Sequence, residues 1–256
     1  MTGDRPKLGE AVANKRGLLI TFEGGDGSGK TTQARLLAER LMKRTYSVVT
    51  TFEPGGTPLG LQVRELLLNT KIPIRPLTRL LLFFAARAEN VETVIKPALA
   101  RGDIVICDRF IDSSAAYQGY GEGLSREKIR QLAQIVTNGL VPDITLLLDV
   151  DPKTSLQRLA AEGDRIGGHL QLGFSMGEPL DGHKREGGWE PEVHERIRAG
   201  YRALATEEPA RWHVLNGTLP PGRIANMVWA RVEPLLCARG LRKDTEDVLS
   251  LQPGQP

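Results

Sequence analysis

Residues 24–31 read Gly-Gly-Asp-Gly-Ser-Gly-Lys-Thr and match the pattern G-x-x-x-x-G-K-[ST] at every fixed position. The apolar run Leu18–Phe22 ends one residue before them, and a helical pattern follows from about residue 30. Glycines let successive backbone N–H groups turn into one concavity that holds phosphate oxygens, and the positive end of the helix adds to this attraction. In this context a chance glycine-rich turn is a poor explanation, so the motif predicts a nucleotide phosphate site.

Short apolar runs alternate with longer helical patterns along the rest of the chain. The runs are near-continuous, as in strands that helices cover on both faces. We expect strands at 18–22, 48–50, 104–107, 144–148 and 213–215, and helices at roughly 30–44, 58–69, 77–100, 125–139, 152–162, 190–209 and 221–237. This alternation predicts an α/β fold, with a five-stranded parallel sheet and helices on both faces.

The chain has 256 residues, enough for one large domain. We expect a single domain over 17–238, between a loose N-terminal arm over 1–16 and a frayed C-terminal tail over 239–256. Residues 167–188 contain seven glycines and no visible periodicity. Loops of this length are usually functional or disordered, so this segment stands apart from the rest of the domain.

Charge, hydropathy and cysteine content exclude several classes of protein. The 34 basic and 31 acidic residues give a net charge of +3, with no long basic block, which argues against a nucleic-acid partner. No apolar run approaches the roughly 18 residues of a membrane-spanning helix, and no N-terminal segment has the pattern of a signal peptide. With only Cys107 and Cys237, a disulfide scaffold is ruled out, and we expect a cytoplasmic protein.

The residues of the glycine-rich loop have distinct expected roles. Lys30 should reach the β- and γ-phosphates of a bound nucleotide, and the Thr31 hydroxyl should ligate Mg²⁺. A carboxylate at the end of a neighbouring strand can hold the same ion through water. Asp108 and Asp149 are rival candidates, and we favour Asp108 because Arg109 follows it and adds an anion contact. The predicted ATP-binding residues are Gly24, Gly25, Asp26, Gly27, Ser28, Gly29, Lys30, Thr31 and Thr32.

From residue 17 to about 237 the sequence resembles the bacterial thymidylate kinase (dTMP kinase) family. The matching blocks are Phe-Glu-Gly at 22–24, Glu-Pro-Gly-Gly-Thr-Pro-Leu-Gly at 53–60, and the segments 82–87, 91–99, 108–119 and 147–150. The resemblance implies a P-loop kinase fold and phosphorylation of dTMP to dTDP by Mg-ATP. It also implies a homodimer, with the helices near 77–100 and 125–139 as candidate interfaces. Alternatives are a related pyrimidine nucleoside monophosphate kinase and a non-catalytic P-loop nucleotide sensor.

The resemblance implies a set of residues that read the base. Phe83 stacks on the thymine ring, and Arg87 donates to the thymine O4 one helical turn later. A spacing of four puts both side chains on one helix face, although Phe83 taken alone is typical of a core residue. Ser114 lies near the base edge, Tyr117 packs under the sugar, and Gln118 is expected nearby.

The resemblance also implies a site for the acceptor phosphate. Arg109 binds this phosphate, because a planar guanidinium can donate two parallel hydrogen bonds. Glu53 and Arg64 match family positions at the same site, although Arg64 is equally typical of an exposed helix charge. Asp26 resembles the carboxylate that faces the deoxyribose 3′-hydroxyl, or it caps the turn of the loop. One departure is Phe52, which stands where the family usually has an arginine, so a charge contact there is missing or supplied elsewhere.

In this family an arginine that stabilises the transition state comes from the phosphate-binding loop or from a lid, here about 162–190. Gly27 occupies the loop position, so the chain resembles the lid-arginine type. Arg165 is the best candidate, and Arg158 either packs near adenine or lies on a helix surface. Residues 167–188 insert into the lid, and we predict that they extend it with little catalytic role.

Overall fold

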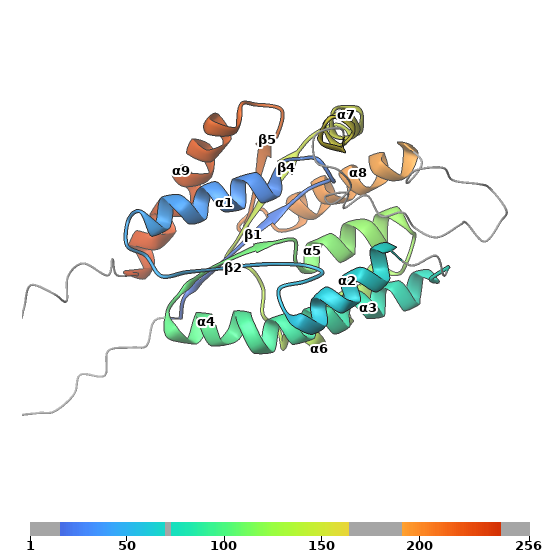
Figure 1. Ribbon diagram of the computed structural model, residues 1–256, viewed down its shortest axis with the longest axis horizontal. Coiled ribbons are helices and arrows are strands. Elements are labelled where there is room, and N and C mark those ends of the chain that lie inside the picture. The colour runs from blue at the N-terminus through green and yellow to red at the C-terminus, as the bar shows by residue number, and fades with distance from the viewer. Residues whose placement is uncertain (1–15, 70–72, 164–190, 242–256) are drawn as a thin grey trace, which may run out of the picture.

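The computed structural model describes residues 16–69, 73–163 and 191–241 of the chain. In these residues one sheet of five parallel strands lies between two layers of helices (Figure 1). The strand order is β2-β3-β1-β4-β5. The strands are β1 (Leu18–Glu23), β2 (Val48–Phe52), β3 (Ile104–Asp108), β4 (Ile144–Asp149) and β5 (Trp212–Asn216). The predicted fold class is therefore confirmed.

The helices lie close to the predicted ranges. They are α1 (Lys30–Met42), α2 (Pro58–Asn69), α3 (Pro76–Asn90), α4 (Lys96–Arg101), α5 (Ile111–Ser114), α6 (Arg126–Thr137), α7 (Pro152–Gly163), α8 (Pro191–Glu207) and α9 (Pro221–Arg239), with two π-helical turns, η1 (Val91–Ile95) and η2 (Ala115–Gly121). The helix expected over 77–100 is divided into α3, η1 and α4. The sequence analysis missed α5 and η2, because the small, polar and glycine residues of 111–121 lack a helical apolar period.

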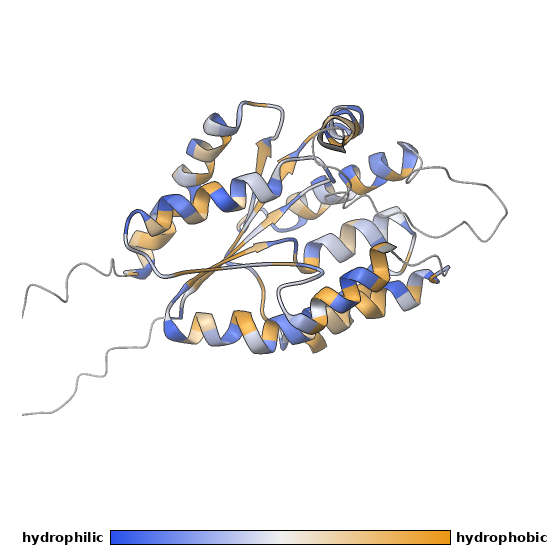
Figure 2. Ribbon diagram, in the orientation of Figure 1, coloured by the Kyte–Doolittle hydropathy of each residue, from blue (hydrophilic) through white to orange (hydrophobic). Residues whose placement is uncertain are grey.

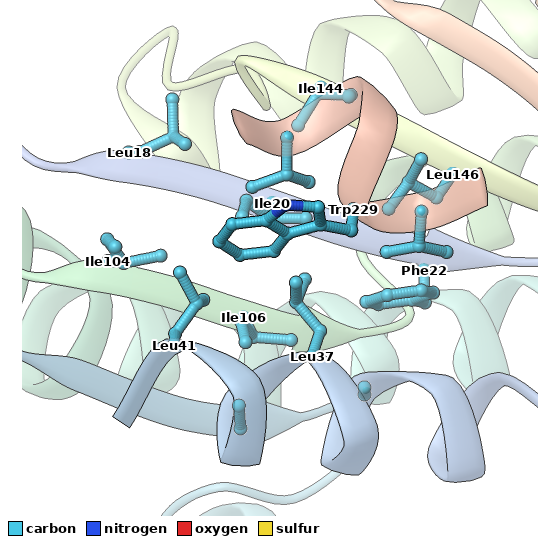
Figure 3. Close-up of a cluster of buried hydrophobic side chains, with 14 of the residues drawn as sticks. Leu18, Ile20, Phe22, Leu37, Leu41, Ile104, Ile106, Ile144, Leu146 and Trp229 are labelled. Atoms are coloured by element: carbon cyan, nitrogen blue, oxygen red, sulfur yellow. The ribbon is translucent and has the colours of Figure 1, made fainter. Parts of the chain in front are cut away.

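Helices α1 and α9 cover one face of the sheet (Figure 1). Their apolar residues form one cluster with the strand side chains that point to this face. Figure 3 shows Leu37 and Leu41 of α1 and Trp229 of α9 gathered against Ile20 and Ile106 of the strands. Burying these large side chains contributes roughly 1.5–3 kcal/mol each to the stability of the fold.

The opposite face of the sheet is covered by η1 and α4 at one end and by α2, α3, η2 and α8 at the other. Leu19 and Val105 point to this face and pack on Val91, Ile95 and neighbouring residues. Figure 2 shows the strands coloured as hydrophobic, whereas the helices mix both classes. Burial on both faces explains why the strands read as continuous apolar runs.

The carboxyl ends of the strands meet at one edge of the sheet. β1 lies at the centre of the sheet, and the chain crosses over it between β3 and β4. In the register, Asp108 pairs with Phe22 on one side and with Phe52 on the other. A crevice at such a crossing is the usual ligand site of open α/β sheets. No helix of the described residues is long and apolar enough to cross a membrane.

Candidate active site

The loop after β1 folds around the first residue of α1. Gly24, Gly27 and Gly29 have φ values of 139°, 72° and 95°, which residues other than glycine rarely adopt. Lys30 opens α1, and its Nζ donates to the carbonyl of Gly25 at 2.6 Å. The predicted loop is thus formed with its lysine inside it, as a phosphate-binding loop requires. Of the remaining predicted ATP residues, Ser28 is buried beside the lysine, whereas Thr31 and Thr32 are exposed on α1.

Lys30 shares a low-dielectric site with a second cation. Burial and the charge of Arg109 together lower the pKa of Lys30 to about 8, although the charges of Asp108 and Asp26 partly oppose this shift. Desolvation and a like charge both disfavour the protonated amine. An anion bound here would relieve this repulsion, so the electrostatics favour a phosphate ligand.

Two carboxylates end strands beside the loop, but their surroundings differ. The Thr31 hydroxyl donates to Asp108 Oδ2 at 2.5 Å. Asp108 Oδ1 is buried and has no hydrogen-bond partner among the described residues. Both oxygens of Asp149, by contrast, accept hydrogen bonds from Arg198, at 2.7 and 3.1 Å. Asp108 therefore has the oxygen that can accept a cation or its water, whereas Asp149 is held in an ion pair.

A cleft opens beside Arg109 on the side of the sheet that α3 and η2 cover. Its lining residues are Glu53, Phe83, Arg87, Arg109, Ser113, Ser114, Tyr117 and Gln118. All of these except Ser113 are residues that the sequence analysis proposed for the acceptor nucleotide. The structure brings them together from α3, α5, η2 and the residues that directly follow β2 and β3.

Arg87 is a buried residue in the lining of this cleft. The side chain is only 1% exposed, and the Phe84 ring lies 4.7 Å from its guanidinium carbon. Its Nε donates to Glu53 Oε2 at 2.6 Å, and its Nη1 donates to the Ser114 hydroxyl at 3.0 Å. Burial raises the pKa of Glu53 above its usual value, although the charge of Arg87 partly opposes this shift. Phe83 both lines the cleft and packs in an apolar cluster, so its two expected roles are compatible.

Arg109 has an unusual backbone and a guanidinium held on two sides. Its φ of 68° is rare for a residue other than glycine. Nη2 forms an ion pair with Asp26 and donates to the Tyr117 hydroxyl at 3.1 Å. Nη1 donates to the carbonyl of Gly24 at 3.2 Å. Its Nε is buried without a hydrogen-bond partner among the described residues. The cleft and the glycine-rich loop after β1 therefore share one arginine.

A family model described as Thymidylate kinase matches residues 22–228. The chain belongs to the thymidylate kinase family. It is 47% identical to the thymidylate kinase of Thermomicrobium roseum over 223 residues, a match that covers 87% of this chain and 97% of the relative. It is 44% identical to the thymidylate kinase of Deinococcus radiodurans over 219 residues, a match that covers 85% of this chain and 97% of the relative. A crystal structure of thymidylate kinase from Ehrlichia chaffeensis matches with a TM-score of 0.66 and 37% identity, over 85% of this chain and 99% of that one.

Phe52 is the position at which the sequence analysis expected a departure from the family pattern, and the structure shows what its ring contacts. The guanidinium of Arg64 lies 5.5 Å from the centre of the Phe52 ring and donates to the carbonyl of Pro54 at 3.0 Å. A side chain on Gly55 would meet the ring at 2.1 Å. Burial and the charge of Arg109 lower the pKa of Arg64. The ring thus contacts the guanidinium of Arg64, a predicted site residue that is not among those lining the cleft.

The lid residues are only partly described. Arg158 on α7 donates to the carbonyls of Gly217, at 3.0 Å, and Gly27, at 3.4 Å. A Cβ on Gly27 would come within 2.5 Å of the carbonyl oxygen of Ser155, so α7 occupies the space of a side chain there. Arg165 lies outside the described residues, as does the glycine-rich segment.

Two residues near Arg109, Glu23 and Tyr201, were not predicted as site residues. Glu23 ends β1 and is fully buried. Tyr201 lies on α8, far along the sequence, and donates to Glu23 Oε2 at 3.0 Å. An acidic residue at the end of a buried strand, directly before the glycines, was an available signal for Glu23. No local pattern links it to Tyr201.

Proposed function

We propose that the chain transfers the γ-phosphoryl group of ATP to the phosphate of dTMP, giving ADP and dTDP. The loop after β1 holds ATP, and the cleft beside Arg109 holds dTMP. The observation that carries this assignment is the cleft itself. It joins an aromatic ring, a buried arginine and the Nε of Arg109, which has no hydrogen-bond partner among the described residues. This combination suits a flat base with a carbonyl edge and an anionic group.

The base is read by Phe83 and Arg87. An arginine has five N–H donors, and three bonds of Arg87 go to Glu53, Ser114 and Phe110. The two others can donate to the thymine O4. A cytosine amine at that place would set donor against donor, which a site built for a carbonyl rejects strongly. Tyr117 packs under the sugar, and Gln118 adds a polar group to the same wall.

Positioning and charge neutralisation supply the catalysis. The acceptor phosphate is already anionic, so no strong general base is required. Lys30 and Arg109 approach the phosphates of ATP and dTMP from one side. Asp26 forms an ion pair with Arg109 and fixes it between these phosphates.

Arg165 is proposed from the sequence to stabilise the transferred group. Arg165→Ala should lower kcat by at least 10²-fold with little change in KM, whereas Arg158→Ala should mainly raise the KM for ATP.

Mg²⁺ fits the residues beside the loop. Thr31 and Asp108 would hold it, since Mg²⁺ prefers oxygen ligands and Asp108 Oδ1 is buried with no hydrogen-bond partner in the part of the chain that the structure describes. In the described ranges no three His, Cys, Asp or Glu side chains group into a metal site of their own. Bound Mg²⁺ would neutralise charge on the phosphates, which commonly supply part of its coordination.

We further propose that the protein acts as a homodimer in the cytoplasm. Exposed leucines on α2 and α3, together with an exposed isoleucine on α6, are candidates for the interface: Leu59, Leu61, Leu66, Leu77, Leu81 and Ile135. The α3 and α6 residues fall on the helices that the sequence analysis proposed. Both cysteines are free, and Cys237 is exposed, which suits a reducing compartment.

An ADP-release assay with Mg-ATP tests the activity. The acceptors are dTMP, dUMP, UMP, dCMP and AMP, with a reaction that lacks an acceptor and with the Lys30→Ala variant as controls. We expect dTMP to be preferred by at least tenfold, and both controls to be silent. If no acceptor supports ADP release, or if ATP is hydrolysed without one, the transferase assignment is wrong and a nucleotide sensor replaces it.

A further inference from the structure

We infer that Glu23 is a positioning residue for Arg109 and that it acts through the hydroxyl groups of Ser113 and Tyr201. The inference rests on the proposed role of Arg109 in holding the acceptor phosphate. It adds residues that do not touch the nucleotide themselves. Three parts of the fold meet at this point: the end of β1, the turn after β3 and the middle of α8.

Glu23 is the fixed centre of the group. Its side chain is fully buried, and both carboxylate oxygens accept hydrogen bonds. Oε1 accepts from the backbone N–H of Phe110 at 2.8 Å. Oε2 accepts from the Ser113 hydroxyl at 2.5 Å and from the Tyr201 hydroxyl at 3.0 Å. A buried carboxylate with three donors is well satisfied, so its geometry is sharply defined.

The two hydroxyls connect this carboxylate to the arginine. Arg109 Nη1 lies 3.3 Å from the Ser113 oxygen and 3.4 Å from the Tyr201 oxygen, and these two oxygens are 2.9 Å apart. Each hydroxyl has a single proton. Burial raises the pKa of Glu23 to about 7, so its carboxylate is ionised above that pH. When both hydroxyl protons point to the ionised carboxylate, the oxygen lone pairs face Nη1, so Glu23 orients two acceptors towards the guanidinium.

The guanidinium is therefore held on two of its three nitrogens. Asp26 and Tyr117 hold Nη2, and the Glu23 group holds Nη1 together with the carbonyl of Gly24. Nε is the nitrogen without a hydrogen-bond partner among the described residues, and Arg109 lines the acceptor cleft. Fixing the other two nitrogens leaves this donor for the acceptor phosphate.

Glu23 also supports the strained backbone at Arg109. Arg109 has a φ of 68°, which costs free energy for a residue other than glycine. Phe110 follows directly, and its N–H is the one that Glu23 Oε1 accepts. One carboxylate thus restrains both the turn that carries Arg109 and the direction of its guanidinium.

Packing around Tyr201 allows the hydroxyl to be tested alone. Its ring is buried in the apolar cluster and meets the Tyr117 ring edge to face, with centroids 6.3 Å apart. Tyr201→Phe keeps these contacts and removes one hydrogen-bond link. Ser113→Ala removes the other link, and Glu23→Gln keeps the shape but removes the charge. Thr21→Val is the matched control, since Thr21 lies in β1 too and its buried hydroxyl pairs with Thr145, away from Arg109.

The test compares the KM for dTMP with the KM for ATP in these variants. Tyr201→Phe, Ser113→Ala and Glu23→Gln should each raise the KM for dTMP about five- to tenfold and leave the KM for ATP within twofold. Thr21→Val should change neither. In an Arg109→Lys background, Tyr201→Phe should add less than a twofold loss, because its effect passes through the guanidinium.

The inference is overturned if the variants change the KM for dTMP and the KM for ATP equally. It is also overturned if Tyr201→Phe raises the KM for dTMP by the same factor with and without Arg109→Lys. Thermal unfolding followed by circular dichroism identifies variants that fail to fold. If Glu23→Gln fails to fold, the kinetics of Tyr201→Phe test the positioning role instead. Wild-type protein that phosphorylates no acceptor overturns the proposed function instead. Calorimetric binding of dTMP to wild type and Tyr201→Phe then tests the positioning role on its own, with equal affinities counting against it.

Discussion

At the scale of single residues, the two buried cations predict a proton linkage. The pKa of Lys30 is lowered to about 8, and ATP phosphates would favour its charged form again. ATP binding should therefore take up a proton near pH 8, and ATP affinity should fall by up to about tenfold per pH unit above it. Titration calorimetry in buffers of different ionisation enthalpy measures this uptake. Lys30→Arg stays charged, so an equal uptake in that variant would contradict the assignment.

The Phe52 ring gives a second prediction for a single residue. It is 38% exposed and supports the Arg64 guanidinium, an interaction that is worth about 0.5–1 kcal/mol at exposed sites. Phe52→Leu, which keeps an apolar side chain without a ring, should raise the KM for dTMP about two- to fivefold, whereas Phe52→Tyr should not. Steady-state kinetics decide it. In an Arg64→Ala background the Leu substitution should have no further effect, and a full additional loss there would refute the contact.

What the sequence predicts about the site depends on how close its residues lie along the chain. Phe83 and Arg87 are four residues apart on one helix, so their shared face could be expected, and both line one cleft. The link from Glu23 to Tyr201 joins positions 178 apart, and no local spacing announces it. The choice of Asp108 over Asp149 likewise rested on a neighbour in sequence, while the pairing of Asp149 with Arg198 appears only in three dimensions.

At the scale of elements, burial determined what could be predicted. Strands covered on both faces read as continuous apolar runs, so all five were found within two residues of their ends. The turn η2 was missed because a π-helical turn breaks the 3.6-residue period. The same turn carries Tyr117 and Gln118 into the cleft. The least predictable element is therefore one that builds the site.

The ion pair between α8 and β4 predicts a local change in stability. Arg198 donates to both oxygens of Asp149, which fastens the N-terminal half of α8 to the end of the sheet. Arg198→Met should speed amide exchange over about residues 191–201, because a partly buried carboxylate is left unpaired, and should leave α9 unchanged. Hydrogen exchange with mass spectrometry measures this. The exposed Arg202 on the same helix is the control, and Arg202→Met with an equal effect would refute the clamp.

At the scale of the whole molecule, the sequence predicts the layers of helices and sheet better than it predicts which strands are neighbours in the sheet. Alternating strands and helices require a covered parallel sheet, but they do not state that the order is β2-β3-β1-β4-β5. The phosphate-binding loop narrows the choice, since it must follow a strand whose neighbours end beside the crevice. The central place of β1 between β3 and β4 meets this requirement, and it is what brings Glu23, Asp108 and Asp149 to one edge.

The face formed by α2 and α3 leads to a prediction about assembly. Leu77 and Leu81 are 56% and 47% exposed and lie one turn apart on α3, where a homodimer would bury them. Leu77→Glu with Leu81→Glu should change the free energy of unfolding of a monomer by only a few tenths of a kcal/mol. In a dimer the same change would bury charges, so the variant should run as a monomer in light scattering after gel filtration. Met227→Glu alters an exposed apolar residue on α9 and should leave the dimer intact. A wild-type monomer, or a double variant that still pairs, would place the interface elsewhere or remove it.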